Sequence, residues 1–136
     1  EDMEVVGPVE TVLWASSSAV DTDFTAKLVD VCPDGSTYNV VEGIVRARFR
    51  NGIDREELLI PDAVYQYQID MSGVGIVFQK GHKICLEISS SNFPKHDRNM
   101  NTGNLVGEDA EGVVAHQKIY HDMEHPSFMK LSIVTR

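Results

Sequence analysis

The sequence predicts an all-β fold, an antiparallel β-sandwich of two packed sheets with about eight strands. Two observations carry this prediction. Apolar and polar residues alternate with a period of two, as in Ile84, Leu86 and Ile88 against Lys83 and Glu87. Turn-forming residues also recur roughly every 8–14 residues, which is typical of short antiparallel strands.

The predicted strands follow one another along the whole chain. They cover Val9–Ser16, Phe24–Val29, Val41–Phe49, Tyr65–Ile69, Val74–Phe78, Lys83–Ser89, Val113–Tyr120 and Phe128–Val134. The first is largely apolar on both faces, which suits an internal strand of a sandwich. Only Ile53–Pro61 is expected to hold a short helical turn.

Two turns between these strands have a clear chemical basis. In Pro33-Asp34-Gly35-Ser36, proline presets φ, aspartate can bond its own backbone, and glycine accepts a positive φ. Lys80-Gly81 predicts a second tight turn, between the strands that end at Phe78 and begin at Lys83.

Length and charge narrow the class of protein. The chain has 136 residues, which predicts one domain over residues 1–136. Its formal charge of −9 argues against nucleic acid or an anionic membrane surface as a partner. No apolar run approaches the roughly 18 residues of a membrane span. The start at Glu1, without a methionine, suggests a mature or excised piece of a longer protein.

The two cysteines, Cys32 and Cys85, are not in a metal-binding spacing. Two half-buried free thiols are the simplest interpretation. A disulfide remains an alternative, because it depends on the Cα atoms lying within about 7 Å of each other. No cofactor or metal is predicted.

Two patterns invite a catalytic interpretation, and each has a simpler one. His121-Asp122-Met123-Glu124-His125 matches H-x-x-E-H, a zinc-peptidase pattern that works on a helix. Here it follows a strand-like run and precedes Pro126, so we expect a polar turn. No G-x-S-x-G elbow occurs, and the serines Ser89-Ser90-Ser91 lack the flanking glycines of a nucleophile. No catalytic residue is assigned.

The acidic pairs Asp21/Asp23 and Glu56/Glu57 suggest calcium ligands or a glycosidase dyad. Calcium needs about six converging oxygens, which a sequence does not reveal. A turn that opens a strand is the simpler interpretation for Asp21 and Asp23. A solvated loop or helix end is the simpler one for Glu56 and Glu57.

The polar segment from Ser90 to Gly103 is too rich in turn-forming residues for a helix and too polar for the core. Loops of this length without secondary structure are uncommon unless they are functional, ordered by a partner, or disordered. Charges and amides surround Phe93-Pro94. Arg98 is expected to pair with Asp97 or another carboxylate and so hold the loop.

The strand–turn–strand–loop run from Val77 to Gly103 resembles the C-terminal non-catalytic β domain of the X-Pro dipeptidyl-peptidase, cocaine esterase and glutaryl acylase family of serine hydrolases. Further segments that resemble the family, in the same order, are Gly7–Ser18, Asp21–Phe24, Leu28–Val31, Pro33–Gly35, Gln117–His121 and His125–Ser127. The resemblance covers roughly Val6 to Val134.

This resemblance implies a jelly-roll sandwich of the galactose-binding-like type. It also implies an accessory role in a hydrolase of esters or peptides, with the nucleophile, acid and base in an α/β-hydrolase domain of the same polypeptide. The implied roles are to support the catalytic domain, to shape the active-site entrance and to contribute to a homo-oligomer. Loop polarity and resemblance together predict a docking loop, formed by Asn92, Phe93, Pro94, Asp97, Arg98, Asn99 and Asn101.

Two other functions stay open at this point. A stand-alone carbohydrate-binding module would hold sugars on exposed aromatic rings, for which Trp14, Tyr65 and Tyr67 are the candidates. A purely structural interaction domain would bind no ligand. An exposed aromatic platform would favour the module, and an apolar patch would favour either of the other two functions.

Overall fold

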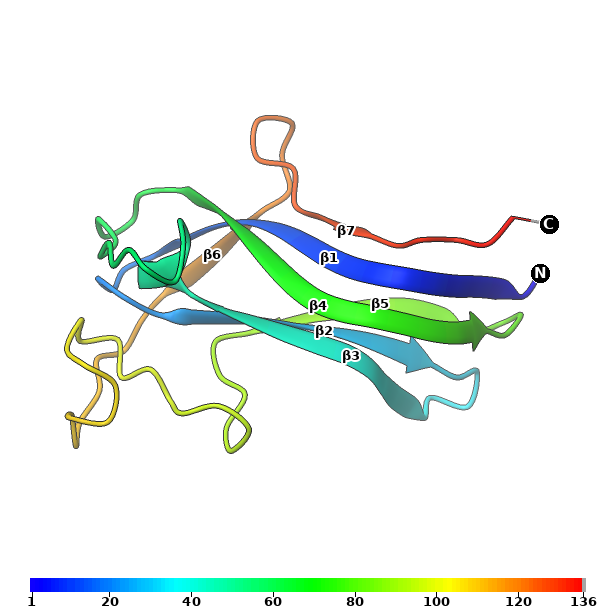
Figure 1. Cartoon of the computed structure of the whole chain (residues 1–136), viewed down its shortest axis with the longest axis horizontal. Coiled ribbons are helices and arrows are strands. Elements are labelled where there is room, and N and C mark those ends of the chain that lie inside the picture. Colours follow the sequence, from blue (N-terminus) through cyan, green and yellow to red (C-terminus); the bar gives the residue numbers. More distant parts are fainter. Residues whose placement is uncertain (136) are drawn as a thin grey trace.

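The structure, a computed structural model that describes residues 1–135, is a sandwich of two antiparallel sheets (Figure 1). Its elements are β1 (Met3–Ser17), β2 (Asp23–Val31), β3 (Thr37–Arg46), the 3₁₀ helix η1 (Ala47–Phe49), β4 (Tyr65–Phe78), β5 (Lys83–Ser89), β6 (Gln117–Tyr120) and β7 (Phe128–Lys130). The predicted all-β sandwich is confirmed. Seven strands, rather than about eight, form within the described residues.

The first sheet is built around β1, which runs almost the length of the molecule. It pairs with β4 on one side, with Leu13 opposite Tyr67. On its other side β6 pairs with Trp14–Ser17, and β7 pairs with Glu10–Val12. Both short strands therefore flank the same edge of β1, and the segment 121–127 projects from the sandwich between them (Figure 1).

The second sheet has the order β3-β2-β5. β2 is central, and its residues face both neighbours: Leu28 lies opposite Val41 of β3 and Leu86 of β5. Between Asp23 and Leu28 only Lys27 is more than slightly exposed. The near-complete burial of β2 follows from its central place in a layer that packs on a second layer.

The core lies between the two sheets and is lined by alternating residues of each strand. In β4 the alternation is regular: Tyr67, Ile69 and Met71 are buried, whereas the residues between them face solvent. The other fully buried apolar residues of the core cluster are Val5, Val9, Leu13, Ala15, Phe24, Ala26, Leu28 and Ala47. A strand with one buried and one solvated face produces this period-two pattern.

The two sheets approach most closely where β3 packs on β4. A Cβ atom at Gly43 would lie 2.3 Å from the backbone oxygen of Asp70. Any side chain at position 43 would therefore overlap the backbone of the facing sheet. Glycine is required here by the close approach of two backbones, not by its own φ angle.

Some predicted boundaries were wrong. The strands predicted at Tyr65–Ile69 and Val74–Phe78 are one strand, β4, which continues through an irregular pairing with β1 between Pro8 and Glu10. The strand predicted to reach Phe49 ends at Arg46, because the chain turns there into η1. The helical turn predicted within Ile53–Pro61 does not form in this segment.

The last two strands are shorter than predicted. β6 begins at Gln117 rather than Val113, and residues 113–116 instead bond to a loop and to the end of β1. β7 ends at Lys130, although Ile133 forms an isolated bridge with Val5 further along.

Both predicted turns form as expected. Gly35 has a φ of 86° and Gly81 a φ of 92°, and the Asp34 carboxylate accepts the backbone N–H of Ser36 at 2.9 Å. Cys32 and Cys85 are free and half-buried, as the simpler interpretation had it. No helix in the described part of the chain is long and apolar enough to span a membrane.

Candidate functional site

Two long loops gather at one end of the sandwich, residues 50–64 and residues 90–116 (Figure 1). We call them together the loop end. They follow η1 and β5, and both pass over the start of β2. Because loops on a rigid scaffold carry function more often than the scaffold does, this end is the candidate functional site.

A buried ion pair lies beneath the loop end. The Asp21 carboxylate is fully buried and accepts the Arg48 Nε–H at 2.9 Å and the Arg48 backbone N–H at 3.0 Å. The Arg48 side chain is only 4% exposed, and it also donates to the backbone oxygen of Asn104 at 2.8 Å. Two buried charges in this geometry satisfy each other, and loss of either would leave the other without compensation.

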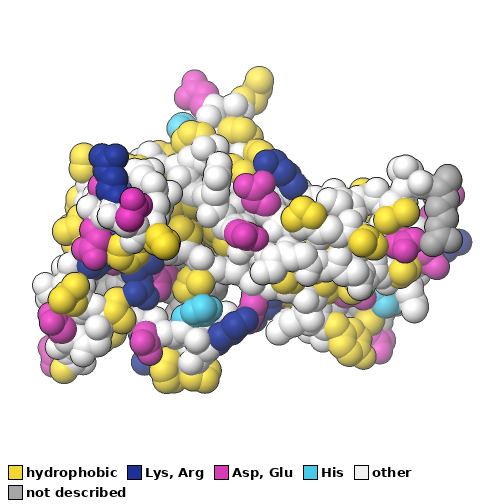
Figure 2. Space-filling model, in the orientation of Figure 1, with side chains coloured by type: hydrophobic (Ala, Val, Ile, Leu, Met, Phe, Trp, Pro, Cys, Tyr) yellow, Lys and Arg dark blue, Asp and Glu magenta, His cyan; other side chains and the backbone are white. Residues whose placement is uncertain are grey.

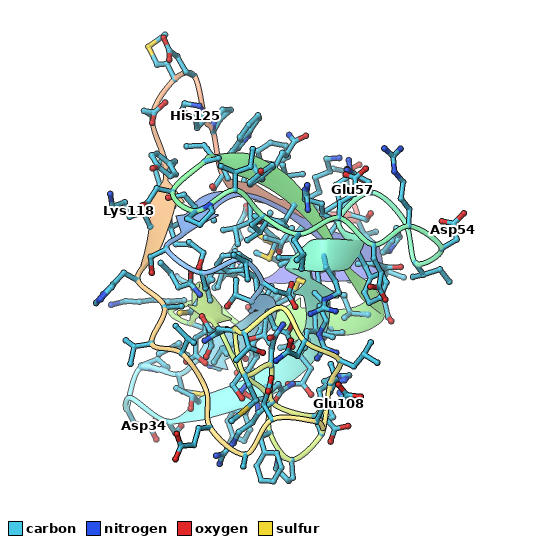
Figure 3. All side chains as sticks on the ribbon, turned by 90° about the vertical axis from the view of Figure 1, so that its left-hand side faces the viewer. Asp34, Asp54, Glu57, Glu108, Lys118 and His125 are labelled. Atoms are coloured by element: carbon cyan, nitrogen blue, oxygen red, sulfur yellow. The ribbon has the colours of Figure 1, made fainter. Side chains whose placement is uncertain are left out.

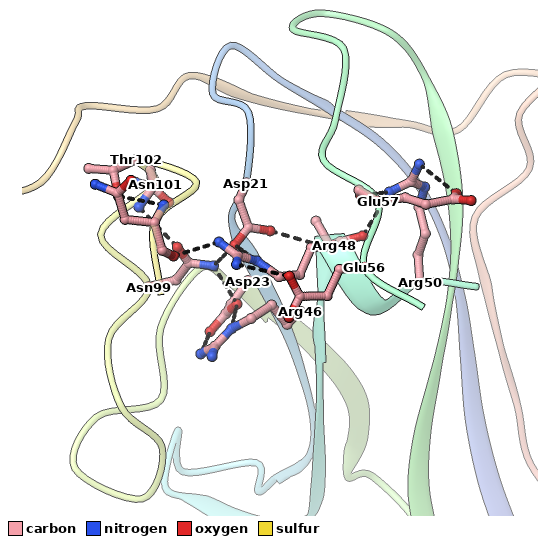
Figure 4. Close-up of polar contacts among 12 residues, drawn as sticks. Asp21, Asp23, Arg46, Arg48, Arg50, Glu56, Glu57, Asn99, Asn101 and Thr102 are labelled. Atoms are coloured by element: carbon pink, nitrogen blue, oxygen red, sulfur yellow. Dashed lines mark hydrogen bonds and ion pairs between the residues drawn. The ribbon is translucent and has the colours of Figure 1, made fainter. Parts of the chain in front are cut away.

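A second ion pair lies beside the first. Arg46 donates through Nε and Nη2 to the two carboxylate oxygens of Asp23, at 2.8 and 2.9 Å (Figure 4). This is the fork geometry that makes arginine–carboxylate pairs strong and directional. The Asp23 carboxylate is almost fully buried, and its hydrogen bond raises the pKa of Arg46 further above the ordinary value.

Asn99 joins the 90–116 loop to both pairs. Its side-chain amide donates to Asp21 at 2.8 Å and to Asp23 at 2.9 Å (Figure 4). The Asn99 oxygen in turn accepts the backbone N–H of Asn101 at 2.9 Å. This one amide therefore fixes the middle of the loop on the buried carboxylates.

Further contacts hold the same loop at both sides. Lys95 donates to the Glu42 carboxylate of β3 at 2.5 Å, and this hydrogen bond lowers the pKa of Glu42 below its ordinary value. Asn101 donates to the backbone oxygen of Val113 at 2.9 Å. Thr102 bonds the Asp109 carboxylate and, with Asn104, lowers its pKa.

The 50–64 loop is fixed through arginine and backbone contacts. Arg50 donates to the backbone oxygen of Glu57 at 2.6 Å, and its guanidinium lies 4.4 Å from the centre of the Tyr65 ring. The Leu59 backbone N–H bonds the oxygen of Val20 at 2.7 Å, and the Leu59 side chain is buried. Both anchors tie this loop to the sandwich.

The two loops also touch each other. A Cβ atom at Gly103, which has a φ of 83°, would lie 2.9 Å from Val20 and 3.4 Å from Leu58. Glycine therefore allows the 90–116 loop to pass close to the 50–64 loop in a left-handed conformation. The loop end is one ordered surface rather than two independent loops.

Despite this order, the loop end exposes many large apolar side chains: Ile53, Leu58, Ile60, Phe93, Leu105, Val106, Val113 and Val114. Ile53 is 93% exposed. In the view toward this end, Asp54 and Glu108 point outward from the periphery of the loops (Figure 3). In the space-filling view, apolar and acidic side chains are interspersed over the same end (Figure 2).

The predicted docking loop is divided by the structure into two groups. Asn92, Asn99 and Asn101 are half-buried, and Asn99 and Asn101 bond within the domain. Phe93, Pro94, Asp97 and Arg98 are exposed. Among the described residues the expected ion pair of Arg98 with a carboxylate is absent. The Arg98 guanidinium instead lies over the Phe93 ring, 4.7 Å from its centre.

The aromatic candidates do not form a sugar-binding platform. Tyr67 is 0% exposed and packs on Phe24 with ring centres 4.8 Å apart. Tyr65 faces the same side and receives the Ile60 backbone N–H at its hydroxyl. Trp14 lies on the opposite face, against the ring of His125. The exposed aromatic surface that a carbohydrate module needs is therefore missing at these three residues.

The H-x-x-E-H segment is a turn between β6 and β7, as the sequence predicts. Asp122 accepts the backbone N–H groups of Glu124 and His125, each at 2.9 Å. The Ser127 hydroxyl donates to the Tyr120 oxygen and accepts the Trp14 backbone N–H. These bonds build a projecting turn, with His125 packed at its base, and not a helix (Figure 3).

The acidic pairs have structural partners. Asp21 and Asp23 are occupied by arginine and asparagine donors, and the Glu57 carboxylate accepts Asn51 and pairs with Arg50 and Arg55. Glu56 is exposed and lies 3.8 Å from Arg48. In the described residues no cluster of histidine, cysteine and acidic side chains is arranged to hold a metal ion.

Sequence reasoning missed the role of the arginines. Arg46, Arg48 and Arg50 alternate from the end of β3 through η1, and Asp21 and Asp23 alternate at the start of β2. In an antiparallel pair these two ends meet, with Asp23 opposite Arg46. Acidic residues at alternate positions on one strand end, next to basic residues at alternate positions on the adjoining one, therefore indicate an ion-pair network.

The family model for the X-Pro dipeptidyl-peptidase C-terminal non-catalytic domain matches residues 1–130. The cocaine esterase of Rhodococcus sp. (strain MB1 Bresler) is 46% identical over 138 residues, which cover 100% of this chain and 24% of that protein.

Solved structures agree with the family match. An aminopeptidase from a marine sediment Thaumarchaeota archaeon superposes with a TM-score of 0.92 at 31% identity, over 99% of this chain and 24% of that one. An α-amino acid ester hydrolase superposes with a TM-score of 0.90 at 28% identity, over 98% and 24%. The chain thus spans about a quarter of the length of these similar proteins.

Proposed function

The chain belongs to the family of X-Pro dipeptidyl-peptidase C-terminal non-catalytic domains, and from this premise we propose that it is the accessory domain of a serine hydrolase. The hydrolase would cleave esters or amides through a serine acyl-enzyme. Its nucleophile, acid and base would lie in an α/β-hydrolase domain of the same polypeptide, outside residues 1–136.

The observation that carries this proposal is the ordered but apolar loop end. Loops fixed by two buried ion pairs present exposed side chains such as Ile53, Ile60 and Val114 in one conformation. A surface ordered in advance loses little conformational entropy when it binds. Exposed apolar side chains beside polar rims are typical of surfaces that pack against another protein domain. We infer that the loop end packs on the catalytic domain.

Docking would give the domain its functional roles. It would buttress the catalytic domain, help to shape the active-site entrance and contribute to an oligomer. Phe93 and Arg98, stacked on each other and exposed at the tip of the 90–116 loop, would be contact residues. Asn99 would act indirectly, because its amide holds the loop on Asp21 and Asp23.

The docking claim is tested by comparing two exposed residues in the full polypeptide. Ile53→Asp changes a loop-end side chain that is 93% exposed, and Met123→Asp changes one that is 98% exposed on the projecting 121–127 turn. Neither change disturbs the core of the domain. We expect only Ile53→Asp to lower the melting temperature and ester turnover, and equal behaviour of the two variants would count against docking at the loop end.

The hydrolase class needs its own measurement. A fluorophosphonate that labels activated serines should inhibit ester hydrolysis by the full polypeptide, and the labelled peptide should lie outside residues 1–136. Inhibition without a labelled serine, or a label inside this domain, would contradict the assignment. Light scattering of the same polypeptide tests the contribution to an oligomer.

A further inference from the structure

The sandwich is closed along one side and open along the other. On the closed side β3 packs on β4, where Gly43 meets the backbone of Asp70. On the opposite side β5 faces β6 and β7, and no comparable packing joins these strands within the described residues. The inward residues Ile84, Leu86 and Ile88 of β5 are consequently only half-buried, whereas their partners Ala26 and Leu28 on β2 are fully buried.

An apolar groove of about 330 Å³ lies on this open side. Its walls are formed by Leu86 and Ile88 of β5, Ile119 of β6, Phe128 of β7 and Leu13 of β1. The groove exists because the 121–127 segment leaves the sheet between β6 and β7, so that Leu13 of β1 has a paired strand only on its β4 side. Its volume lies at the lower end of the roughly 300–1,000 Å³ of small-molecule sites, which suits one or two large side chains.

The rim of the groove is an unpaired strand edge. β5 pairs only with β2 among the described residues, so its other edge presents free backbone N–H and C=O groups. Natural edge strands are usually protected by inward-pointing charges, prolines or bulges. The inward positions of β5 carry isoleucine and leucine instead, and its pairing with β2 is regular from Lys83 to Ser89.

We propose that the groove and the free edge of β5 together bind an extended segment of the same polypeptide. This segment would pair with β5 as a fourth strand of the second sheet, and alternate apolar side chains would enter the groove. Main-chain hydrogen bonds and side-chain pockets are combined in this way in β-strand addition. The second sheet would then match the first in strand number, and the half-exposed β5 side chains would be buried.

The length of the similar proteins favours the same polypeptide over a separate partner. This chain covers 24% of the Rhodococcus cocaine esterase and 24% of the archaeal aminopeptidase. About three-quarters of such a polypeptide lies outside the span described here, and a covalently linked strand binds at a high effective concentration. The inference rests on the proposed function only in taking this chain as part of a longer polypeptide.

A photo-cross-linker in the groove of the full polypeptide tests the proposal. Phe128→p-benzoylphenylalanine is a mild change, because Phe128 is aromatic, lines the groove and is 44% exposed. Tyr38→p-benzoylphenylalanine is the matched control. Tyr38 is 63% exposed and lies on β3, which is the opposite edge of the sheet that contains β5. Mass spectrometry identifies the residue that each cross-linker captures.

We expect the probe at position 128 to form an intramolecular adduct with one extended segment outside residues 1–136, and the probe at position 38 to form none with that segment. An adduct that joins two copies, or no adduct at position 128, would overturn the proposal. Hydrolase activity without the expected adduct would sink this inference alone. The adduct in a polypeptide without hydrolase activity would sink only the proposed function.

Discussion

Replacing Asp21 by asparagine removes a negative charge from the most buried ion pair of the domain. The Asp21 carboxylate accepts three hydrogen bonds, two from Arg48 and one from Asn99, at 2.8–3.0 Å. An asparagine oxygen can retain the bond from the Arg48 backbone. Its NH₂ group would then face the Arg48 side chain and the Asn99 amide, which are both donors.

The expected loss of stability follows from these contacts. One hydrogen bond from a charged donor contributes about 1.5–3 kcal/mol, and one from a neutral amide about 1 kcal/mol. The Arg48 charge, 4% exposed, would also lose its buried counterion, so the total cost should be about 3–5 kcal/mol. For a chain of 136 residues the unfolding entropy is about 0.29 kcal/mol/K. The melting temperature should therefore fall by about 10–17 °C.

Urea and thermal unfolding, followed by circular dichroism, measure this change. The matched control is Glu10→Gln, which breaks the exposed Glu10–Lys130 pair of 2.9 Å and should cost less than about 1 kcal/mol. Adding Arg48→Met to Asp21→Asn removes the uncompensated charge, so the double variant should be at least as stable as Asp21→Asn alone. If Asp21→Asn costs no more than Glu10→Gln, the buried network does not hold the loop end.

Three further changes have defined outcomes. Tyr67→Phe should leave the free energy of unfolding unchanged or raise it by about 1 kcal/mol, because the buried Tyr67 hydroxyl has no protein partner among the described residues. Tyr65→Phe should lower the free energy of unfolding in urea by about 1 kcal/mol, because it removes the acceptor of the Ile60 backbone N–H. Gly43→Ala should destabilise the domain by about 1–3 kcal/mol or more, because the new Cβ atom overlaps the facing backbone at Asp70. Gly75→Ala, whose Cβ atom would lie in open space, should not. Similar Tm values for the two variants would refute the close approach of β3 to β4. The hydrogen bond from Lys95 lowers the pKa of Glu42 in the folded state. The contribution of Glu42 to stability is therefore present above its unfolded pKa of about 4.3 and is lost as the pH falls through the folded pKa. An NMR titration midpoint for Glu42 at or above about 4.3 would contradict its contact with Lys95.

Sequence patterns predicted the layers of the fold better than its strand ends. The alternation of Tyr65, Tyr67 and Ile69 with Gln66 and Gln68 follows directly from one buried and one solvated face, and it appears in the structure as predicted. The sequence pattern could not show that the strands predicted at Tyr65–Ile69 and Val74–Phe78 form one strand, β4. The irregular pairing near Pro8 depends on β1, which is distant in the sequence. Jelly-roll connectivity, expected from the family resemblance, stays a prediction.

The candidate site was predicted only in part. The polarity of the 90–103 segment correctly indicated a long loop with its own hydrogen bonds, but it did not indicate which residues face inward. Asn99 and Arg98 are neighbours of similar polarity, yet Asn99 bonds two buried carboxylates and Arg98 covers Phe93. That division depends on the position of Asp21 and Asp23 at the start of β2, which only the folded sheet defines.

Hydrogen exchange of the full polypeptide decides whether the loop end is buried against a catalytic domain. The side chains of Ile53 and Met123 are almost fully exposed in this domain, so the rest of the domain covers neither of them. If the loop end docks, exchange should be slow around Ile53 and fast around Met123. Fast exchange around both residues would show that nothing covers the loop end and would refute the docking proposal.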